Sequence, residues 1–315
     1  MPVFSCIIEN KTLNPVRLDR YISENLSLLS RSQIKARKLT AKVNGKDVKI
    51  SRIVKPGDRL ELDWIDSPPV DIIPQNIPLE IVYEDTRCVV INKAQGMVVH
   101  PGAGNRQGTL ANALLYRRLN KDGCGKADDA EARNTGLNVR PGIVHRLDKD
   151  TSGIIIAAYD EESHAFLADQ FKTRKVRKKY IAIVQGAPKE NKGRIETCIA
   201  RDNANRKRFK VSANGKTAVT LYKVIKIWRG YSFLLLSPRT GRTHQLRVHL
   251  RHIGCPILGD PVYSGADKNF PGALLMLHSK SISITLPAEE KARDFSSDMP
   301  ERFSQVIKKL EMTNG

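Results

Sequence analysis

Hydrophobic and polar positions along most of the chain follow the short period of β-strands rather than the longer period of helices. Apolar or alternating runs bounded by polar residues predict strands over 79–84, 87–93, 154–158, 180–186, 194–200, 217–228 and 231–237. A helical period appears in residues 162–175 and in 300–312, where Pro300 is a favourable first residue. Strands outnumber helices and seldom alternate strictly with them. The pattern therefore favours an α+β fold with a mixed, mainly antiparallel sheet over a doubly wound parallel sheet.

Residues 17 to 63 have a different pattern, which indicates a small separate module. Four apolar side chains within 17–29 fall on one helical face: Leu18, Ile22, Leu26 and Leu29. Ser30 and Gln33 then form a capping signal for a second short helix over 31–39. The Asn44-Gly45 pair follows, and it predicts a two-residue type I′ hairpin turn because both residue types tolerate positive φ angles.

Proline marks the boundary between this module and the rest of the chain. Residues 67–78 contain four prolines and no helical period, which indicates a stiff linker. We therefore expect an N-terminal domain over 15–65, a linker over 66–79 and a second domain over 80–311. Residues 120–138 are rich in Gly, Ala, Asn and charge, so they are expected to form a mobile surface insertion.

The excess of basic over acidic residues indicates a polyanionic partner. The 315 residues include 53 Lys and Arg against 33 Asp and Glu, a formal charge of +20. Nucleic acid is favoured over a membrane surface for such an excess. Between Arg31 and Lys55 there are nine basic residues and one acid, which is typical of a phosphate-binding surface and makes Arg31, Lys35 and Lys46 candidate RNA contacts.

Other features narrow the class of protein. No apolar run approaches the ~20 residues of a membrane span, and the N-terminus lacks the pattern of a signal peptide, so a cytosolic, cytoplasmic location is expected. The five cysteines are scattered and never spaced as C-x-x-C, which favours reduced thiols over a disulfide framework or zinc site. No oligomer is indicated, and a monomer is expected.

Two clusters suggest metal ligands at first sight. Residues 148–159 begin like a calcium loop, but the twelfth position is Tyr159 instead of glutamate, and the glycine is followed by a strand-like run. His244, His249 and His252 lie among basic residues and lack the H-E-x-x-H spacing, so structural or RNA-facing roles are favoured. We expect neither a metal nor an organic cofactor.

Four stretches together resemble a known family: INKAQGMVVHPGAGNRQGTLANALL, GIVHRLDKDTSGIIIAA, KKYIAIVQG and PRTGRTHQLRVHLRHIGCPILGD. In order and type they are similar to the pseudouridine synthases that act on ribosomal and some transfer RNAs. The resemblance covers roughly residues 80–285 and implies the pseudouridine synthase fold. The N-terminal module resembles the S-four-type domain, a small α/β RNA-binding domain that many large-subunit rRNA synthases of this family carry. Alanine stands at position 94, where the family usually has proline.

The resemblance also implies roles for individual residues. Pseudouridine formation detaches uracil from ribose and rejoins it through carbon 5, so it requires a carboxylate beside the anomeric carbon. By motif position that carboxylate is Asp148, which either attacks the sugar or removes a sugar proton. Arg242 is its expected cationic partner, Tyr180 is expected to stack on the target base, and Arg146 is expected to fill the gap left by the flipped base. Further expected RNA contacts are Lys175, Lys178, Lys179, Arg206, Arg208, His244 and Arg247.

Taken with the resemblance, the sequence is expected to encode an enzyme that isomerises specific uridines in large-subunit ribosomal RNA during ribosome biogenesis. A synthase directed to tRNA is the alternative within the same class, and the N-terminal module favours rRNA. An RNA-binding assembly factor without activity is the alternative from another class. The presence of Asp148, Tyr180 and Arg242 argues against it.

Overall fold

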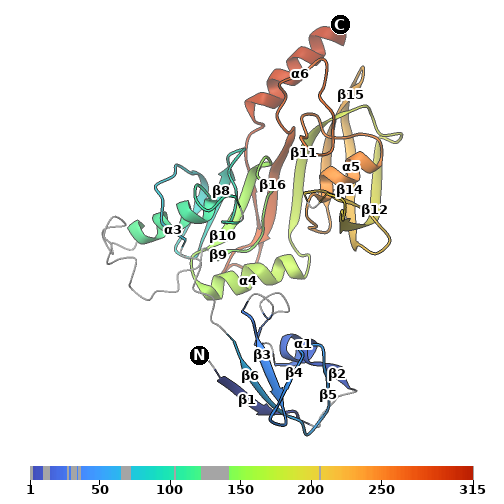
Figure 1. Cartoon of the computed structure of the whole chain (residues 1–315). Helices are drawn as coiled ribbons and strands as arrows, with labels where there is room; N and C mark the ends of the chain where they lie inside the picture. The colour runs from blue at the N-terminus through green and yellow to red at the C-terminus, as the bar shows by residue number, and fades with distance from the viewer. Residues whose placement is uncertain are drawn as a thin grey trace. The chain divides into compact units, whose positions relative to one another are not determined.

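The computed structural model describes residues 3–9, 15–26, 28–29, 34, 37–64, 72–102, 104–121, 142–205 and 207–314. The chain divides into two compact units, Met1–Asp71 and Ile72–Gly315 (Figure 1). Residues 73 and 75, expected within the linker, instead belong to the second unit. The Asn112 side chain donates a hydrogen bond to the Ile73 carbonyl at 2.8 Å, and the Gln75 amide donates to the Asn112 carbonyl at 3.1 Å.

The N-terminal unit contains two small sheets and a short helical segment. The strands are β1 (Val3–Ile7), β2 (Val16–Arg17), β3 (Thr40–Val43), β4 (Lys46–Val48), β5 (Ile53–Val54) and β6 (Arg59–Asp63). They pair in the order β1-β6-β3-β4, with β2 and β5 forming a separate pair. Asn44 and Gly45 have φ angles of 52° and 75°, so the predicted hairpin turn is confirmed. Strand β1 was not predicted, and it places the start of the unit before residue 15.

The first helical segment of this unit is shorter than predicted. It consists of α1 (Leu18–Arg20) and a π-helical turn, η1 (Tyr21–Asn25). Leu18, Ile22 and Leu29 are buried in the core of the unit, as their spacing indicated. Most of the second predicted helix, including Arg31 and Lys35, lies outside the described residues. Lys46 is exposed on β4.

The second unit is built on a large sheet. Its strands are β7 (Glu80–Glu84), β8 (Cys88–Lys93), β9 (Gly142–Ile143), β10 (Ser152–Ala158), β11 (Arg177–Gln185), β12 (Lys192–Arg201), β13 (Phe209–Val211), β14 (Lys216–Trp228), β15 (Tyr231–Pro238), β16 (Leu277–Thr285) and β17 (Ala292–Ser296). The main order is β13-β12-β14-β15-β11-β16-β10-β8-β7, with β17 beside β16 and β9 beside β10. Among the described strands only β10 and β16 pair in parallel. The predicted α+β class with a mainly antiparallel sheet is confirmed.

Helices cover both faces of the sheet around β8 and β10, which explains the continuous apolar runs in these strands. Ile155 and Ala157 face the core that also receives α3 (Leu110–Lys121), α5 (Gln245–His252) and α6 (Glu301–Asn314). Ile154 and Ile156 face the opposite side, where α4 (Glu161–Lys172) packs through Leu167. Helices α4 and α6 were predicted, whereas α3 and α5 were not. Most of the predicted insertion, residues 122–138, lies outside the described residues.

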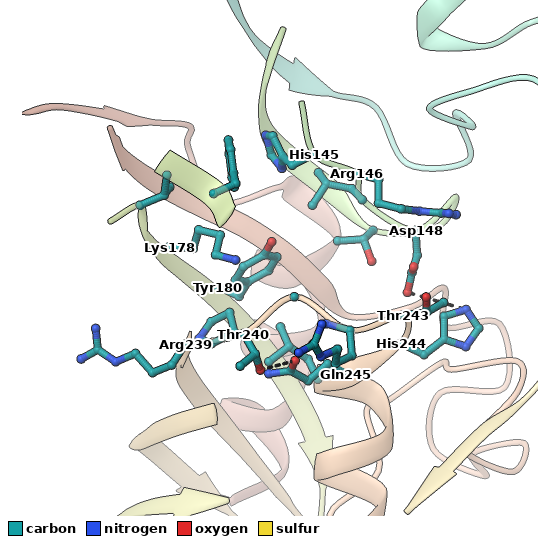
Figure 2. Close-up of a pocket in the computed structure, with 18 of the residues that line it drawn as sticks. His145, Arg146, Asp148, Lys178, Tyr180, Arg239, Thr240, Thr243, His244 and Gln245 are labelled. Atoms are coloured by element: carbon teal, nitrogen blue, oxygen red, sulfur yellow. Dashed lines mark hydrogen bonds and ion pairs between the residues drawn. The ribbon is translucent and has the colours of Figure 1, made fainter. Parts of the chain in front are cut away.

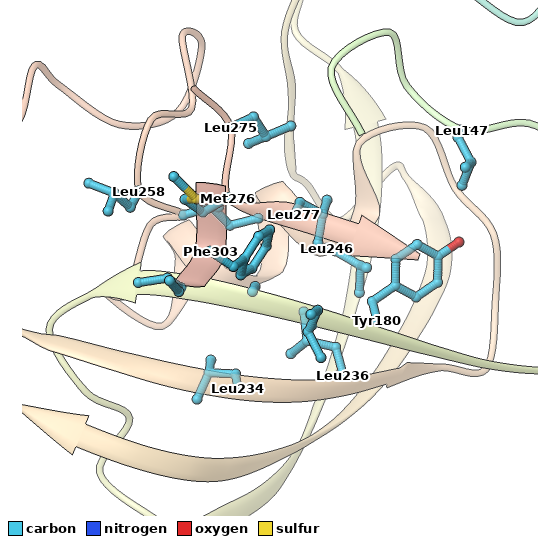
Figure 3. Packing of buried hydrophobic residues seen from close by; sticks show 14 of the residues in the cluster. Leu147, Tyr180, Leu234, Leu236, Leu246, Leu258, Leu275, Met276, Leu277 and Phe303 are labelled. Atoms are coloured by element: carbon cyan, nitrogen blue, oxygen red, sulfur yellow. The ribbon is translucent and has the colours of Figure 1, made fainter. Parts of the chain in front are cut away.

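The larger hydrophobic core of the second unit borders a cavity. Figure 3 shows Tyr180 at the edge of this core, with its hydroxyl directed away from Leu234 and Leu236. Leu246 on α5 and Leu277 on β16 pack in the same cluster. The ring of Tyr180 is therefore fixed by apolar packing on one side, while its polar end reaches the cavity.

Candidate active site

A cavity of about 510 Å³ lies where three segments distant in sequence meet (Figure 2). Its lining comes from residues 144–151 between β9 and β10, from residues 171–180 at the end of α4 and the start of β11, and from residues 238–247, which run from the end of β15 into α5; Leu277 on β16 completes it. Asp148, Tyr180, Arg242 and Arg146 all line it. The structure therefore brings together the four residues to which the resemblance gave roles.

Residues 144–151, here called the aspartate loop, are held at several points. The Thr151 amide donates to the Asp148 carbonyl at 3.1 Å, which closes a tight turn. The Ile156 amide donates to His145 Nε2 at 3.0 Å, and the His145 ring stacks on Phe171. Burial lowers the pKa of His145 to about 3, so this ring accepts as a neutral group at pH 7. The loop is thus a rigid support for its carboxylate.

Glycine 153 explains how the loop enters the sheet. Gly153 has a φ of 111°, and a Cβ atom there would lie 2.2 Å from the Ser279 carbonyl oxygen. Only glycine permits this close approach of β10 to β16. The adjacent Ser152 hydroxyl lies 2.9 Å from His278 Nδ1 on β16. The terminal glycine of the HRLDKDTSG motif is therefore a packing requirement and not a calcium-loop glycine.

Lys93 holds the aspartate loop in place through hydrogen bonds to backbone carbonyls, a role that was not predicted. Its ammonium donates to the carbonyls of Ala94, Met97 and Lys149 at 2.8, 2.8 and 3.1 Å. Lys93 is 1% exposed, and burial lowers its pKa to about 8, opposed by the charges of Asp150 and Asp148. A lysine at the end of the apolar strand CVVINK was the sequence signal for such a buried cation.

The carboxylate of Asp148 contacts a buried arginine, but this arginine is not the predicted one. Arg247 Nη1 donates to Asp148 Oδ2 at 3.3 Å, while Arg242 Nε donates to the Thr217 carbonyl at 3.1 Å. Arg247 is fixed by Asp260, whose two oxygens accept from Nε and Nη2 at 2.7 and 2.8 Å. The prediction that Arg242 pairs with Asp148 is thus corrected to Arg247.

Asp260 was not predicted from the sequence, although it fixes the position and the charge of Arg247. Its side chain is fully buried, and it also accepts from the amides of Val262 and Tyr263 at 2.9 and 3.0 Å. Burial alone would lower the pKa of Arg247, but the hydrogen bonds and charge of Asp260, with a contribution from Asp148, raise it overall. Arg247 is consequently a permanent positive charge aimed at Asp148.

A buried glutamine shapes the TGRTHQ turn. Gln245 Oε1 accepts from the Thr240 hydroxyl and the Arg242 amide at 2.6 and 3.0 Å. Its Nε2 donates to Val219 and Thr220 on β14, each at 3.0 Å. All polar atoms of this amide are therefore satisfied inside the protein. The turn is rigid, and it holds the next residue upstream, His244, in the left-handed conformation with φ 56°.

Tyr180 closes one side of the cavity. A β-bulge lies between Lys179 and Tyr180 in the pairing with β16, and such irregularities redirect side chains next to active sites. Burial raises the pKa of Tyr180 to about 12, so the phenol remains protonated at neutral pH. Tyr180 therefore lines the cavity as a neutral phenol, and its stacking on the target base stays a prediction.

The basic residues predicted to contact RNA differ in their exposure and in whether they line the cavity. Lys178 lines the cavity, and burial lowers its pKa, whereas Lys175 and Lys179 are exposed and do not line it. Arg146 is exposed at the rim of the cavity. Arg208 is half-buried, with its guanidinium 5.8 Å from the centre of the Tyr263 ring. Arg206 lies outside the described residues.

The remaining histidines of the predicted cluster have structural roles or are exposed. His249 is fully buried between the hydroxyls of Thr220 and Thr197, at 2.9 and 3.1 Å, and His252 is exposed. Among the described residues, no group of three His, Cys, Asp or Glu side chains has metal-binding geometry. None of the described helices is long and apolar enough to cross a membrane.

The buried histidines predict a loss of stability in acid. Burial lowers the pKa of His278 to about 3 and that of His249 to about 4, from 6.5 in the unfolded chain. As pH falls below 6.5, the unfolded state takes up protons that the folded state does not, so the free energy of unfolding falls. Each histidine contributes a slope of up to about 1.4 kcal/mol per pH unit.

Urea unfolding between pH 6.5 and 4.5 measures this slope. The variant His278→Gln should be less stable at pH 7, but its stability should depend less steeply on pH. Replacement of the exposed His100 by glutamine is the control and should leave the slope unchanged. Equal slopes for wild type and His278→Gln would contradict the argument.

Comparison with known proteins adds independent observations. Residues 87–252 match the RNA pseudouridylate synthase family. The chain is 43% identical to the ribosomal large subunit pseudouridine synthase D of Borreliella burgdorferi, over 92% of this chain and 88% of the relative. It is 38% identical to the protein of the same name from Zymomonas mobilis, over 95% of each. The solved structure of human RNA pseudouridylate synthase domain containing 4 is 26% identical and covers 74% of this chain and 93% of its own, with a TM-score of 0.56.

Proposed function

The chain belongs to the RNA pseudouridylate synthase family and is an RNA pseudouridine synthase, and from this premise we propose that it isomerises specific uridines of large-subunit ribosomal RNA with Asp148 as the reactive carboxylate. The observation that carries the proposal is the placement of Asp148 in a cavity between the buried Arg247 and the ring of Tyr180. A carboxylate, a fixed cation and a flat aromatic face are the groups that the isomerisation needs.

The geometry around Asp148 leaves one of its oxygens available for chemistry. Two groups of the described residues contact the carboxylate, Arg247 Nη1 at 3.3 Å and His244 Nε2 at 3.9 Å, and both contacts go to Oδ2. No described residue donates a hydrogen bond to Oδ1. In the reaction, the bond between N1 and C1′ breaks, a bond between C1′ and C5 forms, and the proton on C5 is exchanged for one on N1. Oδ1 is free either to add to C1′ or to take a sugar proton.

Other groups in the cavity suit the handling of the detached base. The ring of Tyr180 offers a stacking face that keeps uracil in place while it turns. Lys178 brings a half-buried ammonium to the same cavity, and the described residues place no carboxylate in contact with it. We propose that it binds a carbonyl oxygen or phosphate of the target nucleotide. Arg146 at the rim is placed to occupy the gap in the RNA after the base has flipped out.

The proposal of a ribosomal substrate draws on the names of the relatives and on the charge of the chain. Two of the similar proteins are named ribosomal large subunit pseudouridine synthase D. The formal charge of +20 fits a large RNA partner. All the proposed reacting groups come from one chain, so we propose that the enzyme acts as a monomer, with neither metal nor organic cofactor.

Pseudouridine mapping tests this proposal. Ribosomal and transfer RNA from cells that lack the protein should have lost pseudouridine at one or a few large-subunit sites. Restoring the wild-type protein should restore these sites, and restoring Asp148→Asn should not. Loss confined to transfer RNA would replace the proposed substrate by the tRNA alternative. An unchanged map would favour the noncatalytic assembly factor.

We further propose that the N-terminal unit is an S-four-type RNA-binding domain that selects the substrate. Lys46 is exposed on the hairpin, whereas the proposed reacting residues Asp148, Tyr180 and Arg247 all belong to the second unit. Deleting residues 1–71 should therefore weaken RNA binding and leave turnover on saturating RNA nearly unchanged. If the unit makes about four phosphate contacts, the slope of log affinity against log salt should fall by about 3 to 4 units.

Filter binding at several salt concentrations measures this slope, and circular dichroism checks that the truncated protein is folded. Lys46→Gln should lower the slope by about one unit, while Asp47→Asn on the same hairpin is the matched control and should not lower it. A folded truncated protein that binds RNA at full strength but cannot isomerise it would mean that the N-terminal unit completes the active site.

A further inference from the structure

His244 occupies an unusual place in the active site. It is a non-glycine residue in the left-handed region, which is sparsely populated and is retained at functional sites when the surroundings enforce it. Its ring lies between Phe209 and Tyr263, with ring centres 5.5 and 5.6 Å away and both contacts edge-on. Its two nitrogens face different partners. Nδ1 is 2.9 Å from the Tyr263 hydroxyl, and Nε2 is 3.9 Å from Asp148 Oδ2.

The hydrogen bonds of Tyr263 determine which nitrogen carries the proton. The Phe209 amide donates to the Tyr263 hydroxyl at 2.8 Å, so the oxygen is an acceptor in that contact. The hydroxyl has one hydrogen of its own, Tyr263 is buried, and no other described acceptor lies within its reach. That hydrogen is satisfied only if it is donated to His244 Nδ1. A neutral ring that accepts at Nδ1 must carry its hydrogen on Nε2, the nitrogen that faces Asp148.

We infer that His244 is a positioning residue of the reaction, held by Tyr263 as the neutral tautomer that presents its Nε2 hydrogen to Asp148. The inference rests on the proposed role of Asp148. Arg247 and His244 both contact the same oxygen, Oδ2. Together they restrict rotation of the carboxylate and turn Oδ1 toward the substrate. The inference requires the 3.9 Å separation to shorten to a hydrogen bond in the complex with RNA, as catalytic hydrogen bonds often do.

Burial favours the neutral ring of His244. Burial lowers its pKa most strongly, with Arg247 and Arg146 acting in the same direction and Asp148 and Asp260 opposing them. A doubly protonated ring would also require Tyr263 to accept two hydrogen bonds while its own hydrogen stays buried without a partner. The carboxylate of Asp148 is therefore in contact with one full positive charge, on Arg247, and one neutral donor, on His244. The neutral donor orients the carboxylate without adding a second cation that would weaken its reactivity.

The tautomer can be observed directly by ¹⁵N NMR of the full-length protein labelled at histidine. The His244 signals are identified by their absence in His244→Gln. Between pH 6 and 8, wild type should show a protonated Nε2 and an unprotonated Nδ1. In Tyr263→Phe, which keeps the ring but removes the hydroxyl, this single tautomer should be lost. A proton on Nδ1 in the wild type, or protons on both nitrogens at pH 7, would overturn the inference.

Kinetics on the RNA fragment found by mapping test the effect on Asp148. Tyr263→Phe should lower kcat by about 10- to 100-fold, the usual effect of losing a group that orients a reacting side chain, with KM little changed. Tyr231→Phe is the matched control, because Tyr231 is another buried tyrosine whose hydroxyl is hydrogen bonded, to Asp267. It should leave kcat unchanged. A fall in stability alone, with kcat preserved in Tyr263→Phe, would refute the positioning role.

Two amide substitutions test the roles of the two His244 nitrogens one at a time. The glutamine amide reaches the position of Nε2 and retains a donor toward Asp148, whereas the asparagine amide reaches only the position of Nδ1. His244→Gln should therefore be at least about 10-fold more active than His244→Asn. The reverse order would contradict the inference. The NMR result does not depend on the RNA, so an incorrect tautomer and an incorrect substrate are distinguished: the first changes the spectrum and the second changes only the pseudouridine map.

Discussion

Replacing Asp148 with asparagine is expected to lower turnover by a factor of about 10,000 or more, with the affinity for RNA almost unchanged. The amide has nearly the same shape as the carboxylate and still fits beside Arg247. It can neither add to C1′ nor take a proton from the sugar, so both possible routes are blocked. Tritium release from uracil C5 in the mapped RNA measures turnover, and filter binding measures affinity.

The control for this substitution lies two residues away in the same loop. Asp150→Asn removes a neighbouring carboxylate whose side chain does not line the cavity. It should retain turnover within about fivefold, in the range of substitutions that touch no reacting group. Substantial turnover in purified Asp148→Asn would remove the aspartate from the mechanism. A comparable loss in both variants would instead indicate damage to the aspartate loop.

Replacing Arg247 with methionine is expected to lower both stability and activity. The substitution leaves the fully buried carboxylate of Asp260 without its counter-charge, and breaking a buried pair in this way costs about 3–5 kcal/mol in the free energy of unfolding. Asp148 also loses the donor that fixes Oδ2. Turnover should fall at least about 100-fold, the usual effect of removing one positioned charge or donor. Urea unfolding and single-turnover kinetics measure the two effects.

Arg242→Met is the matched comparison, because Arg242 belongs to the same motif but contacts the Thr217 carbonyl. Its loss should cost no more than about 1 kcal/mol of stability, the value of one partly exposed hydrogen bond. Its effect on activity should appear mainly in RNA affinity. If Arg242→Met proves as inactive as Arg247→Met, the pairing seen in the structure is not the one used in the reaction.

The strands of the second unit could be predicted because their pattern reflects burial on one or both faces. The run IIIAA was recognisable as a strand, and it is buried from both sides by α4 and by the core that α3 and α6 cover. Helix α5 was missed because its sequence, QLRVHLRH, buries Arg247 and His249 as well as leucine. Its apolar side chains, Leu246, Val248 and Leu250, also alternate with polar ones, which is the period of a strand.

The site was predictable only as far as its motifs extend. Asp148 and Tyr180 stand at recognisable positions, and they meet in the cavity. The choice between Arg242 and Arg247 depends on which side chain finds a buried acid, and that acid, Asp260, lies 13 residues beyond Arg247. No local spacing rule connects them. The same is true of Lys93, which reaches the carbonyl of Lys149 from a position 56 residues earlier.

The pairing of β10 with β16 also determines when the enzyme first becomes active during its synthesis. Ser152 and His278, whose side chains meet across these strands, are 126 residues apart, and Arg247 follows Asp148 by 99. Chains emerge from the ribosome from the N-terminus, and contacts of long sequence separation form late. The aspartate loop is therefore synthesised long before the strand and the arginine that support it. A nascent chain that ends before β16 carries Asp148 but has no assembled site, so we expect it not to modify RNA before β16 has been made.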